Sequence, residues 1–180
     1  MTTATLEIPK TITATEMEKN PALWKDFELY EGVPIQMTYA KPKHGILLLR
    51  LGFFINKWIL ENGGSGEVTG GETGIRLNEK ERYSFDLGWS LLPLKGDEIL
   101  QTPLDLMVEI ASDANSAEHL IHKCMRYLEY GAKEVWVLFP EEKLLQVYQP
   151  DKTAKIFQEG TYEPSYMNGF SLDLGKLFRK

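Results

Sequence analysis

The amino-acid sequence predicts an α/β fold, and three patterns support this prediction. Residues 104–111 form a near-continuous apolar run, which is typical of a strand at the centre of a sheet. Apolar residues recur at helical spacing over residues 45–61 and again over residues 117–130. Two apolar runs, at residues 134–139 and 144–149, flank a turn and predict a β-hairpin. Helices and strands are therefore expected to alternate and to pack in layers.

Length and composition favour one globular domain. The chain has 180 residues, of which 43% are hydrophobic and 26% are charged, and these proportions argue against a disordered or fibrous protein. No low-complexity tract or linker divides the sequence. We therefore expect a single domain over residues 1–180, in which residues 1–12 form a flexible or edge N-terminal segment.

The cysteine, apolar and charge patterns indicate a cytoplasmic protein without a membrane partner. Cys124 is the only cysteine, so an internal disulfide cannot form. No run approaches the roughly 18 apolar residues of a membrane span, and the N-terminus lacks the apolar core of a signal peptide. The net charge of -6 opposes tight binding to a polyanion by counterion release. It is still compatible with a nuclease, because a magnesium site needs clustered acids.

The N-terminal part predicts short elements. Residues 13–19 are expected to form a short helix, with Thr13 or Thr15 as its N-cap. Residues 27–39 predict two short strands that are joined through Glu31-Gly32, a common hairpin turn signal.

A loop and a long helix are expected next. Residues 41–44, which include Pro42, predict a loop, and the helix over residues 45–61 is expected to stop at Asn62-Gly63-Gly64. The glycines of residues 65–74 match neither common phosphate-binding pattern, so this segment is expected to be a loop or a bent strand.

Residues 82–91 alternate between large and small side chains and predict a strand. Tyr83, Phe85, Leu87 and Trp89 are expected on one face, and Ser84, Asp86, Gly88 and Ser90 on the other. In the strand over residues 104–111, Glu109 is expected to point away from the apolar side chains on either side of it. If the two strands pair, Asp86 and Glu109 can face the same side within reach of one ion.

The C-terminal half predicts a helix followed by short strands. The helix over residues 117–130 carries an apolar stripe and is capped by Gly131, and spacing of about 100° per residue puts Lys123 at the edge of that stripe. After the hairpin, residues 154–157 are expected to form a strand, and residues 174–178 a short helix.

Glu109 needs a partner if its strand is buried. An isolated ionised carboxylate in an apolar sheet is costly, so it must be protonated, paired with a cation or bound to a metal. A buried arginine such as Arg76 or Arg126 would be a purely structural partner.

The metal alternative brings in further residues. Mg²⁺ and Mn²⁺ prefer oxygen ligands, and one or two protein carboxylates with water and a substrate phosphate are enough to hold them. Asp86 and Glu109, with Glu28 from a nearby element, meet that requirement, and Lys123 could position the attacking water and stabilise charge on the phosphate. The structural alternatives are a solvated Asp86, a surface Glu28, and a Lys123 whose ammonium reaches into water along its packed stem.

The remaining reactive side chains favour structural roles. His44 is expected to cap or to hydrogen-bond locally, and His119 and His122 fit the polar side of an amphipathic helix. Cys124 lies on the apolar stripe, so a buried thiol is expected rather than a nucleophile.

Several short motifs follow one another in a fixed order between about residues 16 and 178. They are Phe27-Glu28-Leu29-Tyr30-Glu31-Gly32, His44-Gly45, Ser84-Phe85-Asp86-Leu87, Asp105 to Ser112, Lys123 with Tyr127 and Gly131, Glu134-Val135-Trp136-Val137 and Gly169-Phe170-Ser171-Leu172. This ordered set resembles the Uma family of restriction endonucleases in the PD-(D/E)xK nuclease superfamily.

The resemblance implies a restriction-endonuclease-like core, in which a mixed central sheet flanked by helices presents acids to Mg²⁺ or Mn²⁺, with additional N- and C-terminal hairpins. It also implies that Asp86 is the motif aspartate, Glu109 the second acid and Glu28 an additional acid. The backbone carbonyl of Ile110 would be a further metal ligand. Two positions depart from the motif: Phe85 replaces the proline, and Ala111 replaces the lysine, whose role Lys123 of the following helix would take.

Two functions follow as hypotheses. The first is a metal-dependent endonuclease, a hydrolase that cleaves DNA phosphodiester bonds with Asp86, Glu109, Lys123 and Glu28 as its catalytic residues. The alternative is a non-catalytic binding or regulatory domain that keeps the nuclease fold with a degenerate site, which Ala111 and the acidic net charge favour. Self-association into a homodimer is a further expectation, because 11% of the residues are aromatic and leave room for an apolar surface patch.

Overall fold

The computed structural model describes residues 8–61, 65–96, 98–112 and 116–179. Residues 1–7 of the expected N-terminal segment, and the expected helix stop at residues 62–64, lie outside this range. The elements are, in order, α1 (Ala14–Glu18), α2 (Pro21–Trp24), β1 (Phe27–Tyr30), β2 (Val33–Gln36), α3 (Pro42–Glu61), β3 (Glu67–Asn78), β4 (Glu81–Ser90), β5 (Leu106–Ile110), α4 (Ala117–Glu129), β6 (Glu134–Phe139), β7 (Leu144–Tyr148), β8 (Ala154–Phe157), β9 (Thr161–Tyr162), β10 (Leu172–Asp173) and α5 (Leu174–Leu177).

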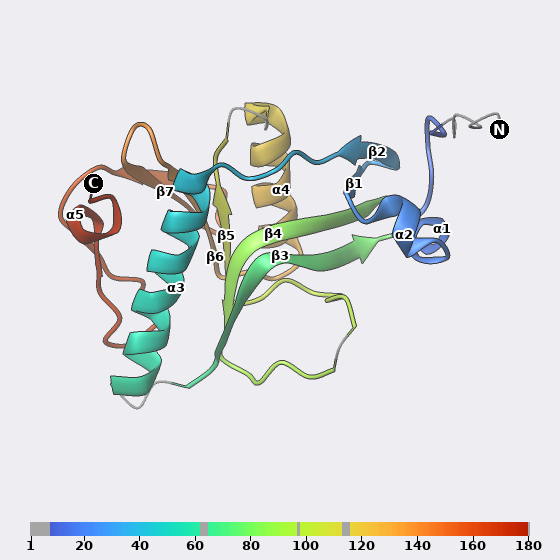
Figure 1. Cartoon of the computed structure of the whole chain (residues 1–180). Helices are drawn as coiled ribbons and strands as arrows, with labels where there is room; N and C mark the ends of the chain where they lie inside the picture. The colour runs from blue at the N-terminus through green and yellow to red at the C-terminus, as the bar shows by residue number, and fades with distance from the viewer. Residues whose placement is uncertain (1–7, 62–64, 97, 113–115, 180) are drawn as a thin grey trace.

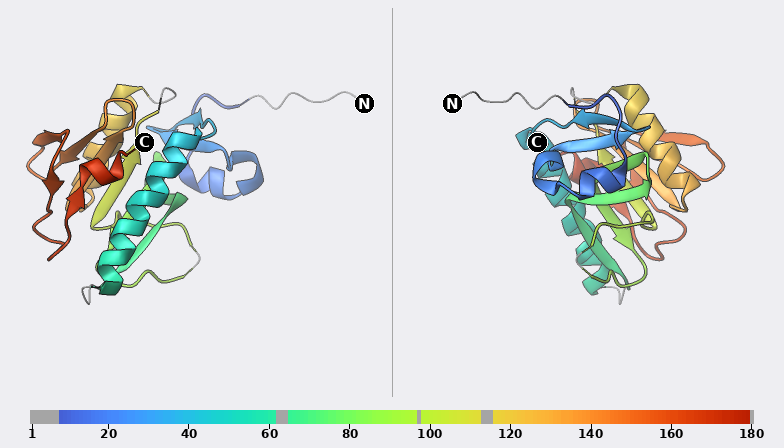
Figure 2. Two further views of the ribbon diagram at one scale, coloured as in Figure 1. Left: turned by 60° about the vertical axis from the view of Figure 1, so that its left-hand side comes forward. Right: turned by 90° about the vertical axis from the view of Figure 1, so that its right-hand side faces the viewer.

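A mixed sheet of eight strands forms the centre of the molecule, as the sequence predicts. Its strand order is β2-β1-β4-β5-β6-β7-β8, and β3 also pairs with β4. Neighbouring strands are antiparallel except β5 and β6, which are parallel. Figure 2 shows the N-terminal elements at one end of this sheet and the C-terminal strands at the other. The fully buried β5 lies at its middle, where a continuous apolar strand is expected.

Helices cover both faces of the sheet (Figure 1). Buried side chains of α3 and α5 pack in one apolar cluster with Leu106, Val108 and Ile110 of β5. Buried side chains of α4 pack in a second cluster with Met107 on the opposite face of the same strand. The alternation predicted for β5 is therefore confirmed, and Glu109 shares the α4 face with Met107. None of the described helices is long and apolar enough to cross a membrane.

Local signals predict the hairpins and the first helix correctly. Thr13 caps α1, with Glu16 completing a capping box. Glu31 and Gly32 both have positive φ, at 49° and 84°, as a two-residue hairpin turn requires. The β1–β2 hairpin forms one edge of the main sheet, whereas β9 and β10 form a separate two-stranded sheet. Residues 65–74 belong mostly to β3, so the bent strand is the correct alternative.

The predicted loop at residues 41–44 is wrong, because α3 begins at Pro42. Proline is well suited to the first position of a helix, where its ring fixes a helical φ and its missing N–H has no partner to lose. The earlier start places His44 in the first turn of α3.

The predicted faces of β4 are also wrong. Tyr83 and Phe85 pack in the cluster beneath α4, but Leu87 and Trp89 pack in the cluster beneath α3. The change occurs at Asp86, where β3 has a register shift between Gly70 and Thr73. A bulge inserts an extra residue and re-aims the side chains around it. The carboxylate of Asp86 thereby leaves the regular alternation of its strand.

Replacing Gly70 with alanine should destabilise the fold by about 1–3 kcal/mol, as overpacking typically does. An added Cβ at Gly70 would lie 2.5 Å from the backbone oxygen of Asp86, and a backbone atom cannot move aside as a flexible side chain can. Urea denaturation measures the effect. The matched control is Gly45→Ala in α3, where an added Cβ meets nothing within 4 Å. Equal stabilities of the two variants would contradict the close approach at Gly70.

Candidate active site

A cavity of about 420 Å³ opens where β1, β4 and β5 meet the first turn of α3 and the side of α4. All five residues that the sequence and the family resemblance single out line it: Glu28, Asp86, Glu109, Ile110 and Lys123. His44, Ser84 and His119 also line it. The fold therefore brings together side chains from five separate elements.

Lys123 is buried at the centre of the cluster. Its side chain is 4% exposed, and its ammonium lies 2.8 Å from Glu109 Oε1 and 3.0 Å from Glu28 Oε1. It also donates to the carbonyl oxygen of Ser84 at 2.8 Å. The structural alternative for Lys123, an ammonium that reaches into water along a packed stem, is wrong, because three acceptors in the interior replace the water.

Glu28 is buried as well, so the surface interpretation of this residue is wrong. Its Oε1 accepts from the backbone N–H of Ser84 at 3.0 Å, in addition to Lys123. Its Oε2 lies 3.1 Å from His119 Nε2. Both carboxylate oxygens therefore have protein partners, and His119 faces the cluster rather than the solvent side of α4, which corrects its predicted role.

Glu109 finds its cation on α4. Its Oε1 contacts Lys123 and also accepts from the Tyr127 hydroxyl at 3.0 Å. The structural partners considered for it, Arg76 and Arg126, are both engaged elsewhere: Arg76 pairs with Glu18 and Glu79, and Arg126 pairs with Glu81 and Glu129.

Asp86 occupies the point where β4 and β5 separate. The two strands pair from Leu87–Val108 to Trp89–Leu106, and beyond this pairing Asp86 Oδ2 accepts from the N–H of Ile110 at 2.6 Å. Its Oδ1 lies 3.0 Å from His44 Nε2. His44 thus contacts a distant strand, not only its own loop as predicted. Asp86 is 19% exposed, so it remains open to the cavity.

The pKa values of Glu28 and Glu109 shift in opposite directions. Burial raises the pKa of Glu28, but Lys123, His119 and Ser84 outweigh it and bring that pKa to about 2. Burial raises the pKa of Glu109 to about 8, with Asp86 and Glu28 adding to the effect and Lys123 opposing it. The single ammonium of Lys123 cannot balance the charges of two buried carboxylates. Hydrogen bonds stabilise the carboxylate form of Glu28 better than that of Glu109, so Glu28 holds the negative charge. Burial lowers the pKa of Lys123, but Glu109 and Glu28 raise it beyond its usual value.

Oxygen ligands suitable for Mg²⁺ or Mn²⁺ are present, although not as the expected trio. Within the described residues, no three His, Cys, Asp or Glu side chains are grouped as metal ligands. The ammonium of Lys123 lies between Glu28 and Glu109, and the side chain of Glu28 is 10% exposed, against 19% for Asp86. Asp86 and Glu109 share the cavity, and two carboxylates suffice when water and substrate complete the shell. The donor set therefore fits a hard divalent ion held by these two side chains.

Sequence reasoning missed three contributors: His119, Tyr127 and Ser84. His119, Lys123 and Tyr127 are spaced by four along α4, so they lie on one face of the helix. All three contact Glu28 or Glu109. This polar stripe beside the apolar stripe of α4 is the sequence feature that could have indicated the positions of His119 and Tyr127. Ser84 carries no such signal, because it acts mainly through its backbone.

Comparisons with known proteins identify a family model and a similar solved structure. The family model Uma2, described as "Putative restriction endonuclease", matches residues 15–175. The chain is also similar to a crystal structure described as that of "a putative nuclease belonging to DUF820" from Anabaena variabilis, with a TM-score of 0.72 and 21% identity over 84% of this chain and 89% of that chain. No curated protein matches the sequence. The structural likeness confirms the restriction-endonuclease-like fold class.

Proposed function

Because this chain belongs to the Uma2 family, described as "Putative restriction endonuclease", we propose that it is a hydrolase that cleaves DNA phosphodiester bonds with Mg²⁺ or Mn²⁺ as cofactor. One observation carries the proposal: Asp86 and Glu109 line a single cavity together with a buried, ion-paired Lys123. The family membership and the nuclease named for the similar structure support the reaction class.

Each residue of the cluster has a role in this proposal. Asp86 and Glu109, with the backbone carbonyl of Ile110, would hold the metal ion, which supplies positive charge that activates water and polarises the phosphate. Lys123 stays protonated beside its acids, so it would act as a fixed positive charge near the phosphate and the attacking water, not as a base. Glu28, engaged by Lys123, Ser84 and His119, positions that ammonium.

Nicking of supercoiled plasmid by the purified protein tests the proposal. We expect conversion to the open circular form with Mn²⁺ or Mg²⁺ and none with EDTA. Absence of nicking with either ion, in protein whose fold is intact, would reject the nuclease assignment.

A second candidate is a nuclease-fold domain that binds its partner without turnover. The observation in its favour is that the ammonium of Lys123 contacts both Glu28 and Glu109, so the two buried acids have a cation without any metal. Titration of Mn²⁺ into the protein separates the two candidates. A heat of binding that disappears in Asp86→Asn supports the metal-dependent enzyme, and silence up to millimolar metal supports the binding domain.

Metal binding should tighten as the pH rises. The carboxylate form of Glu109 is needed to bind a cation, and burial raises the pKa of this side chain to about 8. Below that pKa, a proton competes with the metal, so the dissociation constant for Mn²⁺ should fall by about tenfold or more between about pH 6 and about pH 8. Calorimetry at both pH values measures it. In Glu109→Gln this dependence should disappear, and a constant affinity in the unmodified protein would contradict the mechanism.

A further inference from the structure

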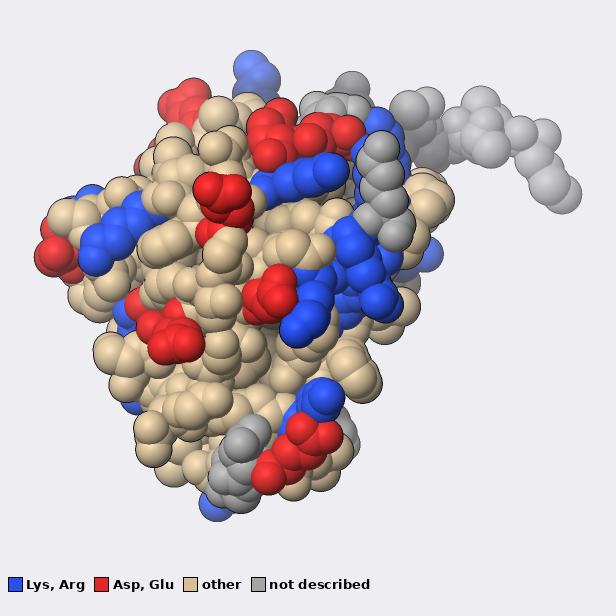
Figure 3. Space-filling model, turned by 90° about the vertical axis from the view of Figure 1, so that its left-hand side faces the viewer, with Lys and Arg blue, Asp and Glu red and all other residues tan. Residues whose placement is uncertain are grey.

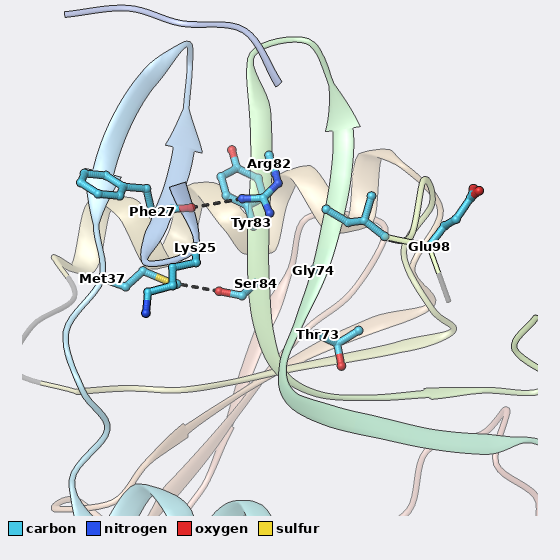
Figure 4. A pocket seen from close by; sticks show the side chains of 10 residues that line it. Lys25, Phe27, Met37, Thr73, Gly74, Arg82, Tyr83, Ser84 and Glu98 are labelled. Carbon is cyan, nitrogen blue, oxygen red and sulfur yellow. Dashed lines mark hydrogen bonds between the residues drawn. The ribbon is translucent and has the colours of Figure 1, made fainter. Parts of the chain in front are cut away.

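A second cavity, of about 340 Å³, adjoins the candidate active site. It lies against β1, β3 and β4, and Lys25 and Arg82 contribute positive charge to its lining (Figure 4). Met37 and Ser84 line both cavities, and Ser84 Oγ lies 3.0 Å from Met37 Sδ. The contact between these two side chains therefore separates two neighbouring cavities, and a chain-like ligand that passes over it would reach both.

Arg82 has unused hydrogen-bonding capacity in this cavity. Its NH1 donates to the carbonyl oxygen of Phe27 at 3.3 Å, and its Nε is buried without any hydrogen-bond partner. Among the described residues, no carboxylate forms an ion pair with its guanidinium, unlike Arg76 and Arg126. A buried donor without a partner is uncommon in a folded protein and calls for an explanation.

Lys25 adds a second cation that is open to solvent. Its side chain is 72% exposed, and the only ion pair formed by it in the described part of the chain is a long one, 3.9 Å, to Asp26. Glu98 also lines the cavity, but Figure 4 shows its carboxylate turned away from Arg82 and Lys25. Among the described residues that line the cavity, Lys25 and Arg82 thus offer two cations to a ligand, and the acid Glu98 is turned away from them.

Other positive side chains suit an anion less well. On the face of α3 and α5, Lys and Arg side chains lie beside Asp and Glu (Figure 3). Lys43 pairs there with Glu141 at 2.7 Å. With a net charge of -6, the protein repels a polyanion over most of its surface. A local cationic cavity next to the acids is therefore the feature that would hold an anionic strand in place.

We propose that this cavity, here called the Arg82 cavity, binds a phosphate group of a nucleic-acid strand next to the phosphate that is cleaved. The planar guanidinium offers several donors to phosphate oxygens at once, and Lys25 adds a mobile point charge. The substrate class in this inference rests on the proposed nuclease function. The inference that the cavity attracts an anion rests on the positions of Arg82 and Lys25 and does not depend on that function.

The test measures binding separately from cleavage. A fluorescein-labelled DNA oligonucleotide, duplex or single-stranded, is titrated with protein in Ca²⁺ buffer, and fluorescence anisotropy gives the affinity at several salt concentrations. Arg82→Gln should weaken binding by about tenfold or more, as loss of a charged hydrogen bond does. Lys25→Gln, whose exposed side chain is dispensable for folding, should reduce the salt slope by about one.

The matched control is Lys155→Gln on β8, which lies at the opposite edge of the sheet from β1 and β2. It should bind as the unmodified protein does. If Arg82→Gln and Lys25→Gln both bind DNA as tightly as this control, or if the unmodified protein binds neither form of DNA, the proposal is overturned. Arg82→Lys, which keeps the charge, should recover part of the affinity and shows that the loss is not a folding defect.

A cleavage measurement keeps this inference distinct from the proposed function. Bis(p-nitrophenyl) phosphate has a single phosphodiester and cannot reach both cavities. Arg82→Gln should therefore slow nicking of plasmid but leave hydrolysis of this small diester unchanged, whereas Asp86→Asn should stop both. If the unmodified protein binds DNA through Arg82 yet cleaves neither substrate, the nuclease proposal fails and the phosphate site stands. Equal slowing of both substrates by Arg82→Gln would overturn the phosphate site.

Discussion

Asp86→Asn should lower metal-dependent DNA cleavage by at least about a thousandfold, equivalent to about 4 kcal/mol of transition-state stabilisation. Asparagine has the shape of aspartate, so its carbonyl oxygen can still accept the N–H of Ile110 that Asp86 accepts at 2.6 Å. What it lacks is the negative charge that a divalent ion needs from this side of the cavity. The variant therefore separates the charge of Asp86 from its structural hydrogen bond.

Three measurements make this outcome specific. Plasmid nicking gives the rate, calorimetry gives the Mn²⁺ affinity, and thermal unfolding shows whether the fold keeps its stability. Asp151→Asn is the control, because Asp151 accepts from the nearby Thr153 in the turn before β8. If Asp86→Asn cleaves as fast as Asp151→Asn, then Asp86 holds no metal and the site must lie elsewhere.

The elements that the sequence predicts correctly depend on local interactions. The Glu31-Gly32 turn and the Thr13 cap are determined within four residues, by positive φ values and by a capping box. Even the start of α3 has a local explanation in Pro42, although proline there was interpreted as a loop residue. Such features need no knowledge of the tertiary fold.

The candidate site depends on contacts that are remote in sequence. Lys123 and Glu28 are 95 residues apart, and His119 and Glu28 are 91 residues apart. Helical spacing places Lys123 at an angle on α4, but only the packing of α4 on the sheet decides whether acids or water lie at that angle. The sequence predicts that Glu109 needs a partner, because an unpaired carboxylate in a buried strand is costly. It does not predict which residue is that partner.

The orientation of Asp86 also depends on a contact outside its own strand. Alternation along β4 predicts that Phe85 and Leu87 share a face, yet they pack on opposite faces of the sheet. The interruption arises in the neighbouring strand, where β3 shifts register between Gly70 and Thr73. A bulge in one strand cannot be deduced from the pattern of the other. The residue at the interruption is the one that the proposed function needs in an open position.

Lys123→Met should cost about 3–5 kcal/mol of stability, which is the usual result of removing one partner from a buried ion pair. Methionine fills similar space but leaves Glu28 and Glu109 without the ammonium that both contact. Lys133→Met is the matched control, because Lys133 is 44% exposed and pairs with Asp105 at the surface. It should cost at most about 1 kcal/mol. Urea denaturation compares the two, and equal costs would contradict the buried position of Lys123.

The pH dependence of this cost identifies its cause. Lys123 is the cation that opposes the effect of burial on the pKa of Glu109, so its removal should raise that pKa further. A carboxyl whose folded pKa lies above its unfolded value of about 4.3 destabilises the protein as pH rises, because the unfolded chain then loses its proton first. Lys123→Met should therefore lose further stability between about pH 5 and about pH 8. Adding Glu109→Gln removes the titrating group, so the double variant should be more stable than Lys123→Met at about pH 8 and should lose most of that pH dependence. If the double variant is instead the less stable of the two, the cost of Lys123→Met is lost packing, and the charge balance inferred for the cluster is wrong.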